Sequence, residues 1–172
     1  QTATEETESS EETTDKEEAN ADEADSDEEE AAEEEADEAE VELEAAIEVE
    51  NDLRSGIVTY ALQFVGNRYK YGGTNPNTGV DCSGFTSYVM RHAAEVELPH
   101  SSGGQSRMGR QVSSSEMRPG DIICYGSGKR INHVALYIGN GQIVHASTER
   151  TGIKVSRWNY RTPVRIVNVL GD

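Results

Sequence analysis

Cysteine and long apolar runs are both scarce in this sequence of 172 residues. Its two cysteines, Cys82 and Cys124, are too few to build a small domain around disulfides. No apolar run approaches the roughly 18–20 residues of a membrane-spanning helix, and no basic region precedes an apolar stretch as in a signal peptide. We therefore predict no transmembrane segment. The chain begins at Gln1 rather than Met, which favours a processed protein or a piece of a longer one.

Positive charge is almost missing from the first 52 residues, which hold 26 acidic residues and a single lysine, for a net charge of −25. Residues 53–172 hold 7 acidic and 14 basic residues, for a net charge of +7. Residues 1–40 also lack aromatic residues and any apolar residue larger than Ala, so they bury too little surface to offset chain entropy. The sequence therefore predicts an acidic low-complexity tail or linker over residues 1–50, disordered at least to residue 40, and a basic domain over residues 51–172.

The basic domain is long enough for one hydrophobic core, and its first half has helical periodicity. Asn51 and Asp52 are favourable N-cap residues, and apolar side chains recur at helical spacing after them. A second helix is predicted from Ser83 to about Val96.

The second half of the domain changes to short strands separated by turns, with the strongest hairpin signal at Asn140-Gly141. Five strands are predicted: IICY, HVALYIG, QIVHAS, IKVSRW and VRIVNVL. Helices followed by a meander of antiparallel strands predict an α+β fold, in which N-terminal helices pack on a sheet of about five strands.

Cys82 lies in the segment DCSGF, after a glycine-rich loop and at the start of the predicted second helix. Unpaired N–H groups and the positive end of the helix dipole meet at such a position. Together with a nearby histidine they lower a thiol pKa from about 8.5 to roughly 3.5–7.5. We expect Cys82 to be a nucleophile with a lowered pKa, and Cys124, within the apolar run IICY, to be a buried structural residue.

Two of the four histidines flank one predicted hairpin: His133 opens the strand HVALYIG and His145 closes QIVHAS. A two-residue loop at Asn140-Gly141 with a regular ladder places them on opposite faces of the sheet. A three-residue loop starting at Gly139, or an equivalent bulge, makes them diagonal neighbours on one face, about 7–8 Å apart by Cα. The sequence leaves both registers open, and a functional histidine pair requires the second.

Metal and phosphate sites are weaker interpretations of the same residues. His92 and His100 read as surface or loop histidines. Cys82, Cys124, His133 and His145 lack the CxxC, HxxH or HExxH spacing of common metal sites, and the glycine-rich stretches lack the lysine of a phosphate-binding loop. We therefore predict no metal and no cofactor.

Six ordered motifs resemble the NlpC family of bacterial cell-wall cysteine peptidases, which have a papain-like fold. The resemblance covers about residues 53–170. The motifs are YKYGG (69–73), DCSGF (81–85), LP followed by Gln105, RPGDI (118–122), HVALYIGNG (133–141) and IVHAS (143–147).

The resemblance implies a catalytic triad. Cys82 matches the nucleophile, His133 matches the base that takes its proton, and His145 matches the residue that orients His133. The resemblance further implies substrate-binding roles: Tyr69 matches a tyrosine near the nucleophile, and Asp81 and Ser83 match residues that hold the free amine of a stem peptide in some members.

Membership implies an extracytoplasmic bacterial hydrolase that cuts peptidoglycan stem peptides, commonly between γ-D-glutamyl and a diamino acid. The related CHAP-type amidases, a thiol acyltransferase and a dormant wall-binding module remain alternatives. The basic domain would also attract anionic wall polymers. No nucleic-acid partner is predicted, and a monomer is expected. The acidic tail is interpreted first as a spacer and second as an electrostatic inhibitor of the basic domain.

Overall fold

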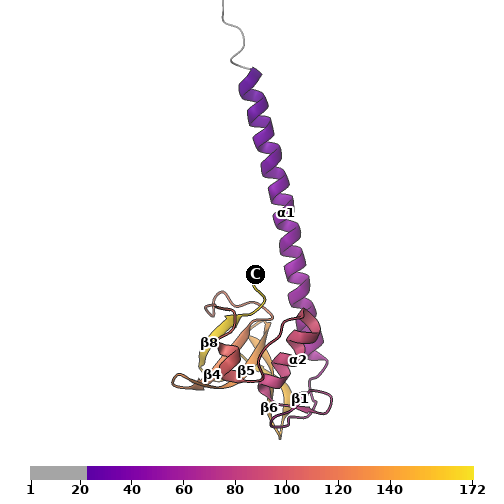
Figure 1. Cartoon of the computed structure of the whole chain (residues 1–172), viewed down its shortest axis with the longest axis vertical. Helices are drawn as coiled ribbons and strands as arrows, with labels where there is room; N and C mark the ends of the chain where they lie inside the picture. Colours follow the sequence, from indigo (N-terminus) through magenta and orange to yellow (C-terminus); the bar gives the residue numbers. More distant parts are fainter. Residues whose placement is uncertain (1–22) are drawn as a thin grey trace, which may run out of the picture. The chain divides into compact units, whose positions relative to one another are not determined.

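A computed structural model describes residues 23–172 and forms two compact units, with the boundary between Glu44 and Ala45. The helix α1 (Glu23–Leu62) contains this boundary (Figure 1). Within residues 23–172, the second unit holds two further helices, α2 (Cys82–Ala94) and α3 (Ser102–Ser106). Its strands form one large antiparallel sheet and one small pair, β1 (Thr74–Asn75) with β2 (Gly79–Val80).

The helix α1 begins at Glu23, not near Asn51-Asp52, so the sequence-based prediction is wrong for residues 23–50. Alanine and glutamate are among the strongest helix formers, and they dominate this segment. Like charges four residues apart cost only about 0.2–0.5 kcal/mol per pair, which is too little to outweigh that preference. The predicted disorder therefore fails for residues 23–40, and its remaining part, residues 1–22, lies outside the described residues.

The last turns of α1 belong to the core of the second unit. Ile57 and Ala61 are fully buried, and Arg54 is only 3% exposed. The Arg54 guanidinium pairs with the carboxylates of Asp121 and Asp172, and its Nη1 also donates to the Pro119 carbonyl oxygen at 2.9 Å. This buried ion pair joins the helix to the turn before β4.

The large sheet has the strand order β3-β8-β4-β5-β6-β7, with all neighbours antiparallel. The helices precede the sheet in the chain, and α2 packs against β5 and β6 (Figure 1). The predicted α+β class is confirmed, with the short strand β3 as a sixth strand in the described residues. The strand bounds are β3 (Arg110–Gln111), β4 (Ile122–Ser127), β5 (Arg130–Gly139), β6 (Gln142–Thr148), β7 (Gly152–Arg157) and β8 (Pro163–Asn168).

Two apolar clusters cover the two faces of the large sheet. The larger cluster joins α1 and α2 to the sheet, through residues such as Ile57, Phe85 and Leu136. The smaller cluster contains Ile123 and Tyr137 on the opposite face. Strand side chains alternate between these clusters, as expected for a sheet covered on both sides.

Cys124 is fully buried in the larger cluster. Burial raises the pKa of its thiol to about 12. This confirms its prediction as a structural cysteine.

Candidate active site

Cys82 is the first residue of α2, and its backbone is fixed by the preceding residue. Asp81 has extended backbone and caps the helix, because its Oδ1 accepts a hydrogen bond from the Gly84 N–H at 2.8 Å. Gly84 has no space for a side chain, since a Cβ there would collide with the Gly73 carbonyl oxygen. The glycine of DCSGF therefore lets the glycine-rich loop pack directly against the first turn that carries Cys82.

The Cys82 thiol is half-buried, and burial raises its pKa above the ordinary value. The backbone N–H groups of Val134, Ser83 and Cys82 itself act in the opposite direction and lower the pKa. The expected net lowering is therefore wrong for the free protein, because desolvation of the thiolate outweighs the helix N-terminus. The N–H groups nevertheless converge where negative charge on the sulfur would form.

The hairpin between β5 and β6 combines features of both registers considered from the sequence. Its turn is the two residues Asn140-Gly141, both with positive φ, and Gly139 pairs with Gln142. A bulge before Gly139 then shifts the ladder, so that Leu136 opposes Val144. The two histidine positions become diagonal neighbours on one face, as the second register requires.

His133 and His145 are in direct contact. The His133 Nε2 and His145 Nδ1 atoms are 2.8 Å apart and hydrogen-bonded, and the His145 Nε2 atom lies 2.9 Å from the Ser156 Oγ. Burial, with a smaller effect of Arg161, lowers the pKa of His133 to about 4. Burial and the neighbouring His133 lower the pKa of His145 to about 3. Both imidazoles are therefore neutral at pH 7.

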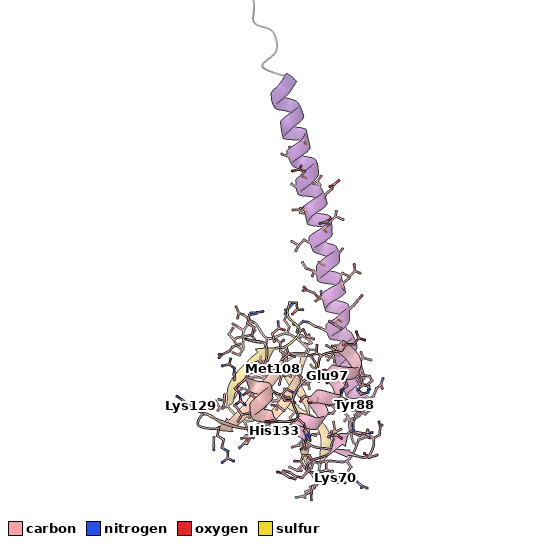
Figure 2. The ribbon with its side chains drawn as sticks, in the orientation of Figure 1. Lys70, Tyr88, Glu97, Met108, Lys129 and His133 are labelled. Carbon is pink, nitrogen blue, oxygen red and sulfur yellow. The ribbon has the colours of Figure 1, made fainter. Side chains whose placement is uncertain are left out.

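The aromatic rings of Tyr125 and Tyr160 lie beside the two imidazoles. The Tyr125 ring centroid is 6.0 Å from that of His133, and the Tyr160 centroid is 5.3 Å from that of His145. Both rings restrict water around the pair and contribute to its desolvation. The label of His133 marks this region within the second unit (Figure 2).

Asp81 makes more contacts than a helix cap needs. Its Oδ2 accepts from the Gly72 N–H at 3.0 Å, and its Oδ1 lies 2.7 Å from the His100 Nε2. The Ser83 hydroxyl is buried and 3.5 Å from the same Oδ1. Both carboxylate oxygens therefore already have partners.

Tyr69 forms an isolated bridge with Val80, two residues before Cys82. Its side chain is half-buried, and burial followed by the nearby Cys82 raises the pKa of its hydroxyl. The structure thus brings Tyr69 close to the thiol.

The described residues hold no group of three or more His, Cys, Asp or Glu side chains arranged to bind a metal ion. In the same part of the chain, no helix combines the length and apolarity needed to cross a membrane.

The model of the NlpC/P60 family matches residues 66–166 of this sequence, which include every residue of the site described above. The chain belongs to the NlpC/P60 family. The resemblance read from the six sequence motifs is thereby confirmed.

Individual proteins are also similar to parts of this chain. The chain is 41% identical over 108 residues to the murein DD-endopeptidase MepS/murein LD-carboxypeptidase of Escherichia coli strain K12, a match that covers 63% of this chain and 56% of MepS. It is 42% identical over 98 residues to the probable endopeptidase p60 of Listeria seeligeri, covering 57% of this chain and 18% of p60. The chain thus matches about half the length of MepS and a smaller part of p60.

The fold is also similar to solved NlpC/P60 structures. The crystal structure of the NlpC/p60 domain of the peptidoglycan hydrolase SagA has a TM-score of 0.62 and 32% sequence identity, covering 67% of this chain and 97% of that domain. This similarity confirms the α+β architecture of the second unit.

Three polar residues around the NlpC/P60 site were not assigned a role from the sequence. Gln105 is fully buried, and its amide nitrogen donates to the Ser83 and Pro99 carbonyl oxygens at 2.9 Å each. It ties the first turn of α2 to the loop before α3. The motif position of Gln105 was a usable signal, whereas Ser156 and His100 become visible only when β7 and the loop fold against the site.

Proposed function

We propose that this chain is a cysteine peptidase that hydrolyses an amide bond in peptidoglycan stem peptides, with Cys82, His133 and His145 as its catalytic triad. The observation that carries this proposal is the buried His133–His145 pair, hydrogen-bonded at 2.8 Å, in which His133 lies in β5 next to Val134, whose N–H hydrogen-bonds to Cys82. Membership in the NlpC/P60 family and similarity to MepS and SagA support the same activity.

The two hydrogen bonds allow two sets of tautomers, and the proposed mechanism uses the one in which His133 accepts the thiol proton. His145 donates its Nε2–H to the Ser156 Oγ, so its Nδ1 carries a lone pair. That lone pair accepts the Nε2–H of His133, which leaves the His133 Nδ1 unprotonated. The His133 Nδ1 is then the atom that accepts the Cys82 proton, and His145 holds the ring in the orientation for this transfer.

Each member of the triad has one role in the proposed reaction. The Cys82 sulfur attacks the amide carbonyl carbon as its proton moves to the His133 Nδ1. Backbone N–H groups at the start of α2 stabilise the oxyanion of the tetrahedral intermediate. His133 returns the proton to the leaving amine, which yields a thioester on Cys82. Water, deprotonated by His133, hydrolyses this thioester and restores the free thiol.

The raised thiol pKa and the lowered imidazole pKa make the resting pair neutral. Charge separation then accompanies attack on the substrate, when bound substrate and the N–H groups stabilise it. The N–H groups of Val134, Ser83 and Cys82, which lower the thiol pKa, support this step.

The bond between γ-D-glutamyl and a diamino acid is the first candidate for cleavage. In this case Asp81 and Ser83 bind the free amine of the stem peptide, and Tyr69 faces the substrate near the nucleophile. The amine then binds at the Asp81 Oδ2, which accepts from the Gly72 N–H, or displaces His100 from the Oδ1.

A DD-type bond between two stem peptides is the second candidate, and two observations favour it. His100 occupies the Asp81 Oδ1, one of the two oxygens at which a free amine could bind. The name of MepS also includes a DD-endopeptidase activity. Cleavage of this bond does not require a free amine at Asp81.

The proposed domain arrangement follows the charge of the chain. Residues 51–172 form the peptidase domain. The acidic residues 1–50 act first as a spacer, and electrostatic inhibition of the basic domain at low salt is their second candidate role. The protein acts outside the bacterial cytoplasm as a monomer, where its substrate and anionic wall polymers occur.

Digestion of purified muropeptides followed by mass spectrometry tests the proposal. We expect fragments whose masses identify one stem-peptide bond, with no release of intact stem peptide from muramic acid. The Cys82→Ala variant is the matched control and should yield no fragments. Intact stem peptides as products would instead identify an amidase, and binding without any product would identify a wall-binding module.

A further inference from the structure

A second polar site lies beside the catalytic elements, where residues of α3, the β4–β5 turn, β5 and β8 line an open cavity of about 580 Å³. Four cationic side chains line it, and none of the lining residues is acidic. The lining residues are Gly103, Ser106, Arg107, Lys129, Arg130, Ile131, Val164 and Arg165. We call this site the cationic cavity.

The four cations of the cationic cavity have no carboxylate partners in the described part of the chain, where the ion pairs involve other arginines. Four like charges around one cavity repel one another, and low-dielectric walls strengthen their field. An anionic ligand would relieve this repulsion. The cavity therefore has the electrostatics of a binding site for anions.

Arg165 lines the cationic cavity and also carries an unsatisfied side-chain donor. Its Nη1 donates to the Gln111 side-chain oxygen at 3.0 Å, which holds the guanidinium in place. Its Nε is buried and has no hydrogen-bond partner. A buried donor without a partner is unfavourable, and the Nε–Nη2 edge of a guanidinium matches the two oxygens of a carboxylate.

The cationic cavity is connected to the proposed triad through two elements. Ile131 lines the cavity and precedes His133 by two residues in β5, about 7 Å along a strand. Ser106 lines it from α3 and follows Gln105, whose amide holds the Ser83 carbonyl beside Cys82. Two peptide residues beyond the scissile bond span a similar length of about 7 Å.

We propose that the cationic cavity is a subsite for the carboxylates of the stem peptide, with Arg165 as the central ligand and Arg107, Lys129 and Arg130 as its electrostatic support. This inference rests on the proposed function, since it names how the same site selects its substrate. Carboxylate recognition here favours stem peptides with free carboxyl groups over those whose carboxyl groups are amidated.

Binding to the Cys82→Ala full-length chain tests the subsite separately from turnover. The probes are the synthetic tetrapeptide L-Ala-γ-D-Glu-diaminopimelate-D-Ala, the same peptide with amidated carboxyl groups, and poly(glycerol phosphate), each measured by calorimetry. We expect the free-carboxylate peptide to bind about 10-fold to 100-fold more tightly than the amidated peptide, as charge-assisted hydrogen bonds predict.

Three further variants on this background locate the effect. Arg165→Gln should abolish the preference for the carboxylate peptide, and Lys129→Gln should reduce it. Lys129 is exposed at the tip of the β4–β5 turn (Figure 2), so Lys129→Gln leaves the core intact. This variant therefore tests the proposal even if Arg165→Gln fails to fold. Arg91→Gln, which removes an equal charge from an exposed position on α2, should retain the full preference.

Persistence of the preference in both Arg165→Gln and Lys129→Gln would overturn the proposal, because the carboxylates would then bind elsewhere. Arg165-dependent binding of poly(glycerol phosphate), without a carboxylate preference among the peptides, would also overturn it and identify a phosphodiester polymer as the occupant.

Hydrolysis by the wild-type chain distinguishes the two proposals. Cleavage of both peptides with equal kcat/KM would overturn the subsite and leave the proposed function intact. Charge-dependent binding, with no product from these peptides or from cross-linked muropeptides, would overturn the proposed function and support the subsite.

Discussion

The two parts of α1 have the same backbone hydrogen bonding but different relations to the rest of the chain. Residues 45–62 bury Ile57 and Ala61 and hold a buried ion pair through Arg54. Residues 23–44 expose even their large apolar side chains, with Val41 67% and Leu43 61% exposed. Residues 23–44 therefore depend on intrinsic helix preference, and residues 45–62 depend on tertiary packing.

This comparison teaches that a helix assignment alone does not measure structural importance. A substitution at Arg54, Ile57 or Ala61 removes packing or leaves a charge unpaired, whereas one at the exposed Val41 or Leu43 changes only local helix preference. The same contrast separates residues that carry the proposed chemistry from residues that tune the electrostatics around it.

The largest expected effect sharpens this contrast within the domain itself. Cys82→Ala should reduce hydrolysis to background, because it removes the proposed nucleophile, with little change in melting temperature. Cys124→Ser should retain the nucleophile but lose about 1–3 kcal/mol of stability, because it buries a hydroxyl among apolar side chains. Muropeptide digestion and thermal melts of both variants measure this. Equal loss of activity in two folded variants would contradict the assignment of Cys82.

The buried ion pair of α1 should give the next largest effect. Arg54→Met leaves the buried Asp121 carboxylate without its cation, whereas Asp172 keeps its pair with Arg118, and we expect a loss of about 3–5 kcal/mol in the free energy of unfolding. Arg91→Met, in an exposed pair with Glu97, is the control and should cost under about 1 kcal/mol. Denaturant unfolding measures both. Similar costs for the two variants would remove the distinction between anchored and exposed charges.

Acidification should destabilise the domain through its buried histidines. The pKa of His133 is about 4 and that of His145 about 3, both below the ordinary value of about 6.5 that applies in the unfolded chain. Below pH 6.5 the unfolded chain therefore binds protons that the folded chain does not, so stability falls as the pH falls toward 4. Above about pH 7.5, the stability of the domain should not depend on the ionisation of His133 and His145.

Thermal melts between pH 7.5 and 4.5 measure this loss, which we expect to be several degrees. His145→Asn should reduce the pH dependence, because one buried titrating group is removed. His92→Gln replaces an exposed histidine outside the pair and should retain the wild-type dependence. A wild-type dependence in His145→Asn would show that other groups cause the acid loss.

The smallest effect is expected from removal of the acidic residues 1–44. Removal of residues 1–44 should change the melting temperature of the domain by less than its error, since the exposed helix surface contributes no core packing. At low salt the truncation should increase the hydrolysis of anionic wall material several-fold. The reason is that the negative charge of residues 1–44, which repels or competes with anionic ligands, is removed. The difference should vanish near 1 M salt, where the Debye length is about 3 Å.

Rates of the full chain and of residues 45–172, measured on the same wall preparation at both salt concentrations, decide this point. Equal rates at every salt concentration would leave the acidic segment as a spacer. A fall in melting temperature on truncation would instead show that residues 23–44 contribute to the stability of the domain.

Local sequence patterns predicted much of this architecture. Period-two alternation and the Asn140-Gly141 turn placed five strands, because side chains on a covered sheet must alternate between its faces. Cap and glycine positions placed the start of the helix that carries Cys82. The same reasoning failed for residues 23–40, since it weighed charge repulsion above the stronger helix preference of alanine and glutamate.

The ionisation of Cys82 was the other point at which local reasoning failed. A helix N-terminus lowers a thiol pKa, but the strands and loops that cover Cys82 desolvate it and raise the pKa instead. Desolvation depends on what packs over a group, which its neighbours in sequence do not specify.

By itself, the sequence determined the family motifs, the charge asymmetry and the identities of Cys82, His133 and His145 as candidates. Only the tertiary structure decided that a bulge aligns the two histidines, that Ser156 and His100 join the site, and that four cations from separate elements line one cavity. The physical reason is that motifs and propensities are local, whereas register, burial and charge convergence arise only when distant segments pack together.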